Sequence, residues 1–335
     1  MKVLRLHGVG DVRFHDEPIP SPAPGEEIVR VKAVGVCGSD LHWFTEAGIG
    51  SSRWVKPIVL GHESAGVIES GLRRGTRVAI DPAIPCGKCE FCERGHPNLC
   101  ENLYFAGTAT DDGTFREYIA WPSRCLFPLP DTLSDADGAM LEPLGIALFA
   151  LDLCHLKLGM TVGVFGCGPI GLLILQLARL AGAGQLLATD LLPHRLEAAR
   201  QFGATVFLAD KDSREAAEVL KATHGKGVDV AFEAAGESAA VETAVAAAKS
   251  GGKVILVGIP ADDRTSFNAS NARRKGLTLK AVRRMKHTYP RAIRLVESGL
   301  VDVRSIVTHR FPFSEAAQAF ALAEKREGLK FMVEP

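Results

Sequence analysis

The stretch "VGVFGCGPIGLLILQLARLAG", residues 162–182, decides the fold. It begins as an apolar strand, turns through Gly166, Gly168 and Gly171, and continues with a helical pattern. Between a strand and a helix, such glycines allow a tight turn, a close approach of the backbone to a pyrophosphate and close packing of helix on strand. The pyrophosphate then lies at the helix N-terminus, where free N–H groups and the helix dipole favour an anion. The stretch predicts a dinucleotide site; the alternative is a glycine turn that binds no ligand.

Strand and helix patterns alternate around this loop. Strand patterns cover 161–166, 185–190, 205–210, 228–235 and 253–258, and helical patterns cover 169–182, 192–203, 213–225 and 238–252. This alternation predicts an α/β unit with a doubly wound parallel sheet, which we place at residues 146–282.

Asp190 ends the second of these strands and favours NAD as the dinucleotide. A carboxylate there accepts hydrogen bonds from the adenosine ribose and repels a 2′-phosphate. Leu191 follows it, where an NADP enzyme often carries a basic residue. NADP stays the alternative.

The rest of the chain has a different pattern. Residues 1–130 are rich in Val, Gly and Pro and carry short alternating runs, such as those at 27–36 and 77–84, which predict an irregular β-rich domain. A helix at 289–299, a strand at 307–312 and a helix at 314–328 follow the nucleotide unit. We expect residues 1–145 and 283–335 to form one second domain.

The composition excludes several classes of protein. The 335 residues are 47% hydrophobic and 23% charged, with a formal net charge of +0, so no basic patch indicates nucleic-acid binding. The N-terminus lacks the apolar core of a signal peptide, and no uncharged apolar run is long enough to span a membrane. We expect a cytoplasmic protein whose thiols stay reduced.

Four cysteines cluster in "CGKCEFCERGHPNLC", at Cys86, Cys89, Cys92 and Cys100. Thiolates at this spacing can surround one zinc ion in a tetrahedron, and four of them leave no open position. The cluster therefore predicts a structural zinc site. A disulfide pair and an iron–sulfur cluster are the alternatives.

A second set of possible ligands lies in "GVCGSDLH" (35–42) and "LGHESAGV" (60–67). Cys37, His62 and Glu63 offer one thiolate, one imidazole and one carboxylate. Three protein ligands with an open position are typical of a catalytic zinc site. Taken singly, each residue has an ordinary structural explanation, so the spacing alone leaves the metal site open.

Together these residues resemble the zinc-dependent medium-chain dehydrogenases, and among them the polyol group typified by sorbitol and xylitol dehydrogenases. The resemblance spans essentially the whole chain and also includes "DGTFREYIAWP" (112–122), "LEPLGIAL" (141–148) and "HTYPRAIRLVESG" (287–299). It implies a GroES-like catalytic domain, a Rossmann domain, catalytic and structural Zn²⁺, NAD and a homotetramer. It also implies reversible oxidation of a polyol's secondary alcohol to a ketone, with hydride transfer to NAD.

The resemblance assigns roles residue by residue. Cys37, His62 and Glu63 match the catalytic zinc ligands, Ser39 and His42 match a proton relay, and Glu142 matches a carboxylate that touches zinc or its water. The residues matching cofactor contacts, besides the glycine loop and Asp190, are Ile170, Arg195, Val257, Gly258, Ile259, Val282, Arg283 and Arg284. Trp43, Glu142 and Arg284 match the substrate pocket.

Some positions depart from the polyol pattern. Trp43 and Met285 stand where tyrosines are frequent, and His287 stands where an asparagine is frequent. These departures leave the identity of the polyol open. L-Threonine and simple alcohols are alternative substrates, and an NAD-binding protein without catalysis is a third alternative.

Overall fold

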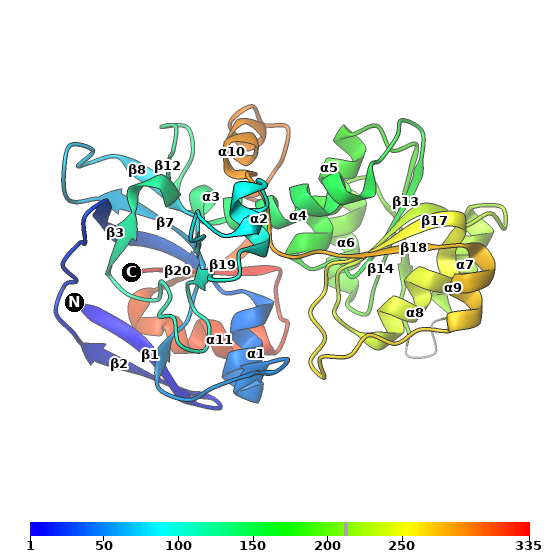
Figure 1. Cartoon of the computed structure of the whole chain (residues 1–335). Coiled ribbons are helices and arrows are strands. Elements are labelled where there is room, and N and C mark those ends of the chain that lie inside the picture. The colour runs from blue at the N-terminus through cyan, green and yellow to red at the C-terminus, as the bar shows by residue number, and fades with distance from the viewer. Residues whose placement is uncertain (211–213) are drawn as a thin grey trace. The chain divides into compact units, whose positions relative to one another are not determined.

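The computed structural model describes residues 1–210 and 214–335, which divide into two compact units (Figure 1). Unit 1 comprises Met1–Gly145 and Lys286–Pro335, and unit 2 comprises Ile146–Met285. The sequence placed the second boundary after residue 282. Residues 283–285 belong to unit 2 because the chain is still hydrogen-bonded to the sheet just before them. The Val282 N–H donates to the carbonyl of Leu256, the last residue of β17, at 2.8 Å.

Unit 2 is built on a six-stranded parallel sheet in the order β15-β14-β13-β16-β17-β18. Its strands are β13 (Thr161–Phe165), β14 (Gln185–Asp190), β15 (Thr205–Leu208), β16 (Val228–Glu233), β17 (Ala248–Leu256) and β18 (Thr278–Ala281). Its helices are α5 (Pro169–Leu180), α6 (Pro193–Gln201), α7 (Glu215–Ala222), α8 (Ser238–Ala247) and α9 (Ala269–Lys275). The strand order reverses between β13 and β16, so the predicted Rossmann-type sheet is confirmed.

The helices of unit 2 bury apolar side chains against this sheet. One buried cluster joins Val219 of α7 and Val245 of α8 to Phe165, Leu187 and Val254 of the strands. Helices α5 and α6 contact β13, β14 and β15. In Figure 1 the strands of the sheet lie between helices of this unit.

One predicted helix of unit 2 is wrong at its end. The pattern at 238–252 predicted a single helix, but α8 ends at Ala247 and β17 begins at Ala248. Pairing with β16 overrides the local helical preference there, and the Lys275 ammonium donates to the Ala246 carbonyl at 2.6 Å and the Ala248 carbonyl at 2.9 Å. Residue 213, which begins the helix predicted over 213–225, lies outside the described residues.

Unit 1 contains a seven-stranded, mostly antiparallel sheet in the order β12-β8-β7-β3-β20-β19, with β11 also paired to β3. The strands of unit 1 are β1 (Lys2–Gly8), β2 (Asp11–Asp16), β3 (Glu26–Gly35), β4 (Gly48–Ile49), β5 (Ser52–Arg53), β6 (Ile58–Val59), β7 (Glu63–Ile68), β8 (Arg77–Ile80), β9 (Ala83–Ile84), β10 (Tyr104–Phe105), β11 (Tyr118–Pro122), β12 (Leu126–Pro128), β19 (Val307–Pro312) and β20 (Lys330–Glu334). The β-rich prediction is confirmed, and the C-terminal strand β20 pairs with β3 from the N-terminal half.

Short helices complete unit 1. They are α1 (Gly38–Glu46), α2 (Glu90–Glu93), α3 (Asp135–Ala139), α10 (Tyr289–Glu297) and α11 (Ala316–Glu324), with 3₁₀ turns at Pro97–Leu99, Ser123–Cys125 and Phe313–Glu315. Helix α4 (Leu141–Cys154) begins in unit 1 and continues into unit 2. Among the described residues, no helix has both the length and the apolar character needed to cross a bilayer.

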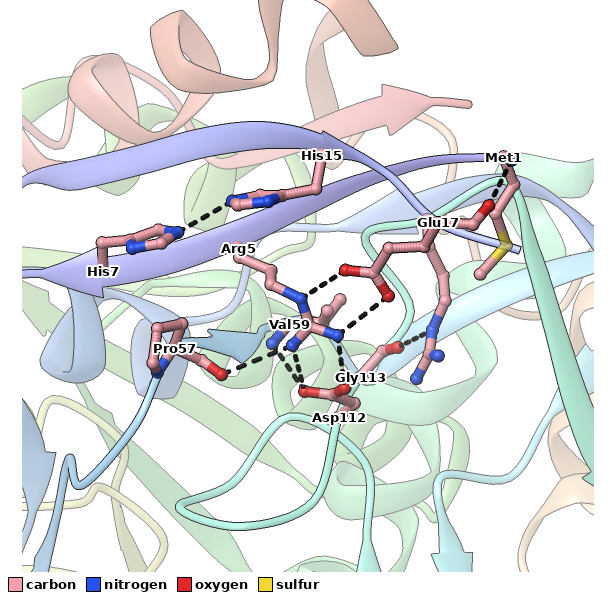
Figure 2. Close-up of polar contacts among 10 residues, drawn as sticks. Met1, Arg5, His7, His15, Glu17, Pro57, Val59, Asp112 and Gly113 are labelled. Carbon is pink, nitrogen blue, oxygen red and sulfur yellow. Dashed lines mark hydrogen bonds and ion pairs between the residues drawn. The ribbon is translucent and has the colours of Figure 1, made fainter. Parts of the chain in front are cut away.

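A partly buried ion-pair cluster connects the N-terminal hairpin to the segment that leads to His62. The Arg5 guanidinium pairs with Glu17 at 2.6 Å and with Asp112 at 3.0 Å (Figure 2). Asp112 also accepts the Val59 N–H at 3.0 Å. The next residues of the Asp112 loop bond the backbone of residues 59–61. Backbone hydrogen bonds and ion pairs together therefore hold residues 59–61 in place.

Candidate metal centres and nucleotide site

The side chains of Cys37, His62 and Glu63 converge at the end of two paired strands. Cys37 precedes α1 and follows β3, His62 precedes β7, and Glu63 begins β7 opposite Gly35 of β3. One ligand atom from each lies within 4.8 Å of the others. A Cβ at Gly35 would collide with the Glu63 carboxylate, so glycine is needed there. A thiolate, an imidazole and a carboxylate fit zinc.

Asp40 holds two of these three ligands and was missed by the sequence analysis. It is fully buried in the first turn of α1 and accepts the backbone N–H of Cys37 at 2.9 Å and of Gly61 at 3.1 Å. Its Oδ1 lies 3.4 Å from His62 Nδ1. A carboxylate facing one ring nitrogen of a histidine orients the other nitrogen towards a metal. Asp40 is such a supporting carboxylate for His62.

Electrostatics at His62 reflect these neighbours. Burial acts to lower the pKa of His62, but the negative charges of Asp40 and Cys37 outweigh it and hold that pKa well above its ordinary value. A metal ligand must be the neutral imidazole, so metal binding displaces a proton here.

Lys330 is the second residue that the sequence analysis missed. It is buried at the start of β20, and its ammonium donates to both oxygens of the Glu63 carboxylate, at 2.8 and 2.7 Å. Burial acts to lower the pKa of Lys330, but the charges of Glu63 and Cys37 raise it above its ordinary value. Lys330 is therefore a buried cation beside the ligand set.

The four cysteines of the second cluster also meet. One sulfur from each lies within 4.8 Å of the others, and all eight cysteines of the chain are free thiols. Backbone N–H groups are the main cause that lowers the pKa of Cys86, to about 6, and of Cys89, whereas burial is the main cause that raises the pKa of Cys92, to about 12. A thiol that ionises readily is suited to bind zinc, and four sulfurs close the coordination sphere. This set fits a structural zinc ion.

The glycine loop joins β13 to α5, as the sequence predicted. Gly166 has a positive φ of 105°, and a Cβ there would lie 2.7 Å from the Ala235 nitrogen. Gly168 caps the N-terminus of α5, and Gly171 packs so closely that a Cβ would strike the Gly166 carbonyl oxygen. The geometry therefore requires glycine at Gly166 and Gly171, whereas Gly168 has room for a Cβ and begins the helix whose N-terminus could hold an anion.

Asp190 lies at the end of β14 and is attached to this loop. One carboxylate oxygen accepts the Cys167 N–H at 2.7 Å, and the other accepts the Leu192 N–H at 2.9 Å. A Cβ at Gly168 would lie 3.8 Å from the Arg195 Nη1, so Arg195 is near the loop too. The cofactor roles of Asp190, Arg195 and Ile170 stay predictions.

Comparison with known proteins finds a family match for the part of the chain with the metal ligands and another for the part with the glycine loop. The family described as "Alcohol dehydrogenase GroES-like domain" matches residues 23–131, and the family described as "Zinc-binding dehydrogenase" matches residues 169–298. Sorbitol dehydrogenase of Bacillus subtilis is 36% identical over 343 aligned residues, covering 100% of this chain and 97% of the relative. The chain belongs to the zinc-binding medium-chain dehydrogenases.

Solved structures of this dehydrogenase family superpose on the whole chain. A zinc-binding dehydrogenase from Sinorhizobium meliloti 1021, bound to NADP, is 31% identical with a TM-score of 0.90 over 100% of this chain and 99% of the other. The 2R,3R-butanediol dehydrogenase of Bacillus subtilis is 30% identical with a TM-score of 0.87 over the same shares. The chain is therefore a zinc-binding, NAD(P)-dependent enzyme of the alcohol dehydrogenase family.

The structure places the two predicted relay residues of this dehydrogenase on α1. Ser39 Oγ lies 3.3 Å from His62 Nε2, so the hydroxyl borders the ligand set. His42 lies one turn later, and its Nδ1 is 3.2 Å from a carboxylate oxygen of Glu46. Their part in proton transfer stays a prediction.

The predicted pocket residues of the dehydrogenase lie in both units. Glu142, in the first turn of α4, is buried, and this burial together with the nearby Glu63 charge raises the pKa of its carboxyl to about 7. Among the described residues, the close ligand cluster contains Glu63 but not Glu142. Trp43 is 1% exposed, and its indole N–H has no hydrogen-bond partner in the described chain. Arg284 belongs to unit 2 and has a φ of 57°.

The stretch at 257–259, predicted to contact the cofactor, follows β17 and is held by the backbone carbonyl of the buried Glu233. Glu233, at the end of β16, accepts the N–H groups of Ala235 at 2.7 Å and Gly236 at 2.6 Å. Its own carbonyl accepts the N–H groups of Val257 at 2.8 Å and Gly258 at 3.1 Å. The next residue, Ile259, is 48% exposed, and Val282 and Arg283 follow β18. Contacts of these residues with a cofactor stay predictions.

Proposed function

We propose that this dehydrogenase reversibly oxidises a secondary alcohol of a polyol to a ketone, with NAD as the hydride acceptor. The observation that carries the proposal is the convergence of Cys37, His62 and Glu63 beside the Ser39 hydroxyl. The names of relatives add support, because sorbitol and butanediol both carry neighbouring hydroxyl groups.

When bound, zinc supplies a Lewis acid for the alcohol oxygen, and NAD supplies the hydride acceptor. Cys37, His62 and Glu63 would hold the metal. Asp40 supports two of these ligands, because it accepts the Cys37 backbone N–H and faces the His62 ring. Ser39 Oγ would accept the hydroxyl proton of the substrate. His42 is three residues further along α1, on the same face of the helix, and would pass a proton to solvent.

The preference for NAD over NADP is part of the proposal. Asp190 is fixed by two backbone N–H groups, so a 2′-phosphate at the ribose would meet a carboxylate that cannot turn away easily. Leu191, the next residue, is 50% exposed and offers no positive charge. NADP stays the alternative, because a relative binds it and Arg195 could supply a positive charge for its 2′-phosphate. Initial rates with the two cofactors at equal concentrations test this preference.

The substrate class is tested by following NADH formation with zinc-loaded protein on sorbitol, xylitol, galactitol, L-threonine and ethanol. Turnover of one or more polyols supports the proposal. Turnover of L-threonine alone would move the chain to a neighbouring branch of the family, and turnover of ethanol alone would assign simple alcohol chemistry. No turnover on any substrate despite NAD binding would favour a binding protein.

The relay is tested by Ser39→Ala, with Ser298→Ala as the control on an exposed helix end. Loss of a positioned proton acceptor should lower kcat by about 10²–10⁴-fold, while the zinc content stays unchanged. Unchanged turnover in Ser39→Ala would remove Ser39 from the relay.

A further inference from the structure

The carboxylate of Glu233 lies at the end of β16, beside the point where the strand order of unit 2 reverses. It is 1% exposed, and one of its oxygens accepts the backbone N–H groups of Ala235 at 2.7 Å and Gly236 at 2.6 Å. Burial raises the pKa of this carboxyl, whereas four backbone N–H groups, including that of Gly258, act to lower it. A buried carboxylate is costly unless such donors satisfy it. The backbone of two loops therefore surrounds Glu233.

Three loops meet around this carboxylate by close packing of their backbones. They are the glycine loop after β13, residues 234–237 after β16 and residues 257–259 after β17. A Cβ at Gly258 would lie 2.1 Å from the Gly236 nitrogen and 2.8 Å from a Glu233 carboxylate oxygen. A Cβ at Gly166 would lie 2.7 Å from the Ala235 nitrogen. The Glu233 side chain is therefore bonded to a junction at which all three loops touch.

The strand order determines which half of a dinucleotide meets this junction. Parallel strands present their carboxyl ends at one edge of a sheet, and a dinucleotide binds across the point where the strand order reverses. The proposed function places the adenosine half beside Asp190, at the end of β14. Strands β14 and β16 lie on opposite sides of β13, which leads to the glycine loop for the pyrophosphate. We therefore expect the nicotinamide half on the side of β16 and β17, at the loops that Glu233 joins.

We propose that Glu233 is a positioning residue for the nicotinamide half of the cofactor. Its carboxylate joins residues 234–237 to residues 257–259, so the surface formed by both loops is set before the cofactor binds. Without the carboxylate, part of the binding free energy would be needed to order these loops. The inference rests on the NAD site of the proposed function, and it does not depend on the polyol.

The test compares NADH with ADP, which keeps the adenosine half and both phosphates but lacks the nicotinamide riboside. Calorimetry on the zinc-loaded full chain measures the dissociation constant of each ligand. Glu233→Gln keeps the size of the side chain but replaces one acceptor oxygen by an NH₂ group, which cannot accept a backbone N–H. This variant should bind NADH about tenfold more weakly, an effect typical of one lost hydrogen bond to a charged group. Its affinity for ADP should stay unchanged.

Asp229→Asn is the matched control. Asp229 lies near the opposite end of β16, where its carboxylate accepts the Thr161 N–H at 2.8 Å and pairs with Lys249. The substitution likewise replaces an acceptor oxygen of a carboxylate that is bonded to the backbone of unit 2. It should lower the unfolding temperature and leave the affinities for NADH and ADP unchanged.

A selective loss of NADH affinity in Glu233→Gln supports the inference. An equal loss for NADH and ADP would indicate general damage to unit 2, and an unchanged NADH affinity would show that the carboxylate does not position the loops; either result overturns the inference. If Glu233→Gln does not fold, Gly236→Ala tests the same junction, because a Cβ there would lie 2.4 Å from the Ile259 carbonyl oxygen while Glu233 is kept. Gly236→Ala should also lose NADH affinity selectively, and an equal or absent loss overturns the inference.

The unmodified chain separates this inference from the proposed function. If the unmodified chain does not bind NADH, the NAD site fails, and both proposals fall. If NADH binding responds to Glu233→Gln as expected but no polyol is turned over, the polyol oxidation fails and the role of Glu233 stands.

Discussion

Replacing Asp40 by asparagine should uncouple one of the two zinc ligands that Asp40 supports. The carboxylate accepts the Cys37 N–H through one oxygen, and through the other it accepts the Gly61 N–H and faces His62 Nδ1. An asparagine has only one oxygen, so its NH₂ group must face one of these N–H donors. In one orientation the Cys37 backbone loses its acceptor, and in the other the Gly61 backbone loses its acceptor and His62 Nδ1 faces an NH₂ group.

The expected loss follows from these contacts. A buried hydrogen bond to a charged group contributes about 1.5–3 kcal/mol, and Asp40 is 0% exposed. Changing a carboxylate that orients a histidine ligand lowers metal affinity by about 10–100-fold. We therefore expect Asp40→Asn to bind the catalytic zinc about 10–100-fold more weakly and to leave the four-cysteine site unchanged.

The assay is zinc content per chain after graded exposure to a chelator, together with the temperature of unfolding. Asp137→Asn is the matched control, because Asp137 is also buried, also accepts a backbone N–H at a helix start, and lies in the same unit. The control should unfold at a lower temperature but keep both zinc ions. If Asp40→Asn retains the catalytic zinc as firmly as this control, Asp40 is only a helix cap and the reasoning is refuted.

Two further predictions concern the scaffold. Gly171→Ala should destabilise unit 2 and abolish NAD binding, because a Cβ at this position has no room. Gly168→Ala has room for a Cβ, so this variant should fold but bind NAD more weakly. Thermal unfolding and cofactor titration distinguish the two outcomes. Arg5→Met should destabilise unit 1 by about 1–3 kcal/mol at neutral pH. Arg5 lowers the pKa of Glu17 directly, and it lowers the pKa of Asp112 against an opposing effect of burial, so this stability is present above the ordinary carboxyl pKa and is lost as pH falls through the folded value. Chemical denaturation should therefore show the variant and the unmodified chain converging below about pH 4, and a constant difference would contradict the ion-pair explanation.

Features that depend on nearby residues could be predicted from the sequence. The glycine loop has its turn, its close approach and its helix start within a few residues, so the spacing alone determines the local geometry. The four cysteines likewise lie in one short segment, and their sulfurs meet as the spacing predicted. The end of α8 could not be predicted in this way, because the strand pairing that decides it involves β16.

Asp40 and Lys330 could not be found by the same reasoning, for two different reasons. Asp40 lies within the quoted "GVCGSDLH", but an aspartate three residues into a helix is also an ordinary capping residue. Its contact with His62 becomes visible only when the segment before β7 is placed beside α1. The signal that could have drawn attention to it is an acidic residue next to a proposed ligand pair.

Lys330 is separated from Glu63 by 267 residues, and no spacing rule connects them. Its neighbours "GLKFMV" are typical of an apolar strand with one charge, which sequence reasoning places at the surface. The chain returns from unit 2 to add β20 to the sheet of unit 1, and this return brings the lysine into the interior next to β3. The C-terminal segment therefore completes the sheet and also places a buried positive charge against the ligand set. A metal site whose three ligands come from residues 37–63 thus depends, for its charge balance, on the last strand of the protein.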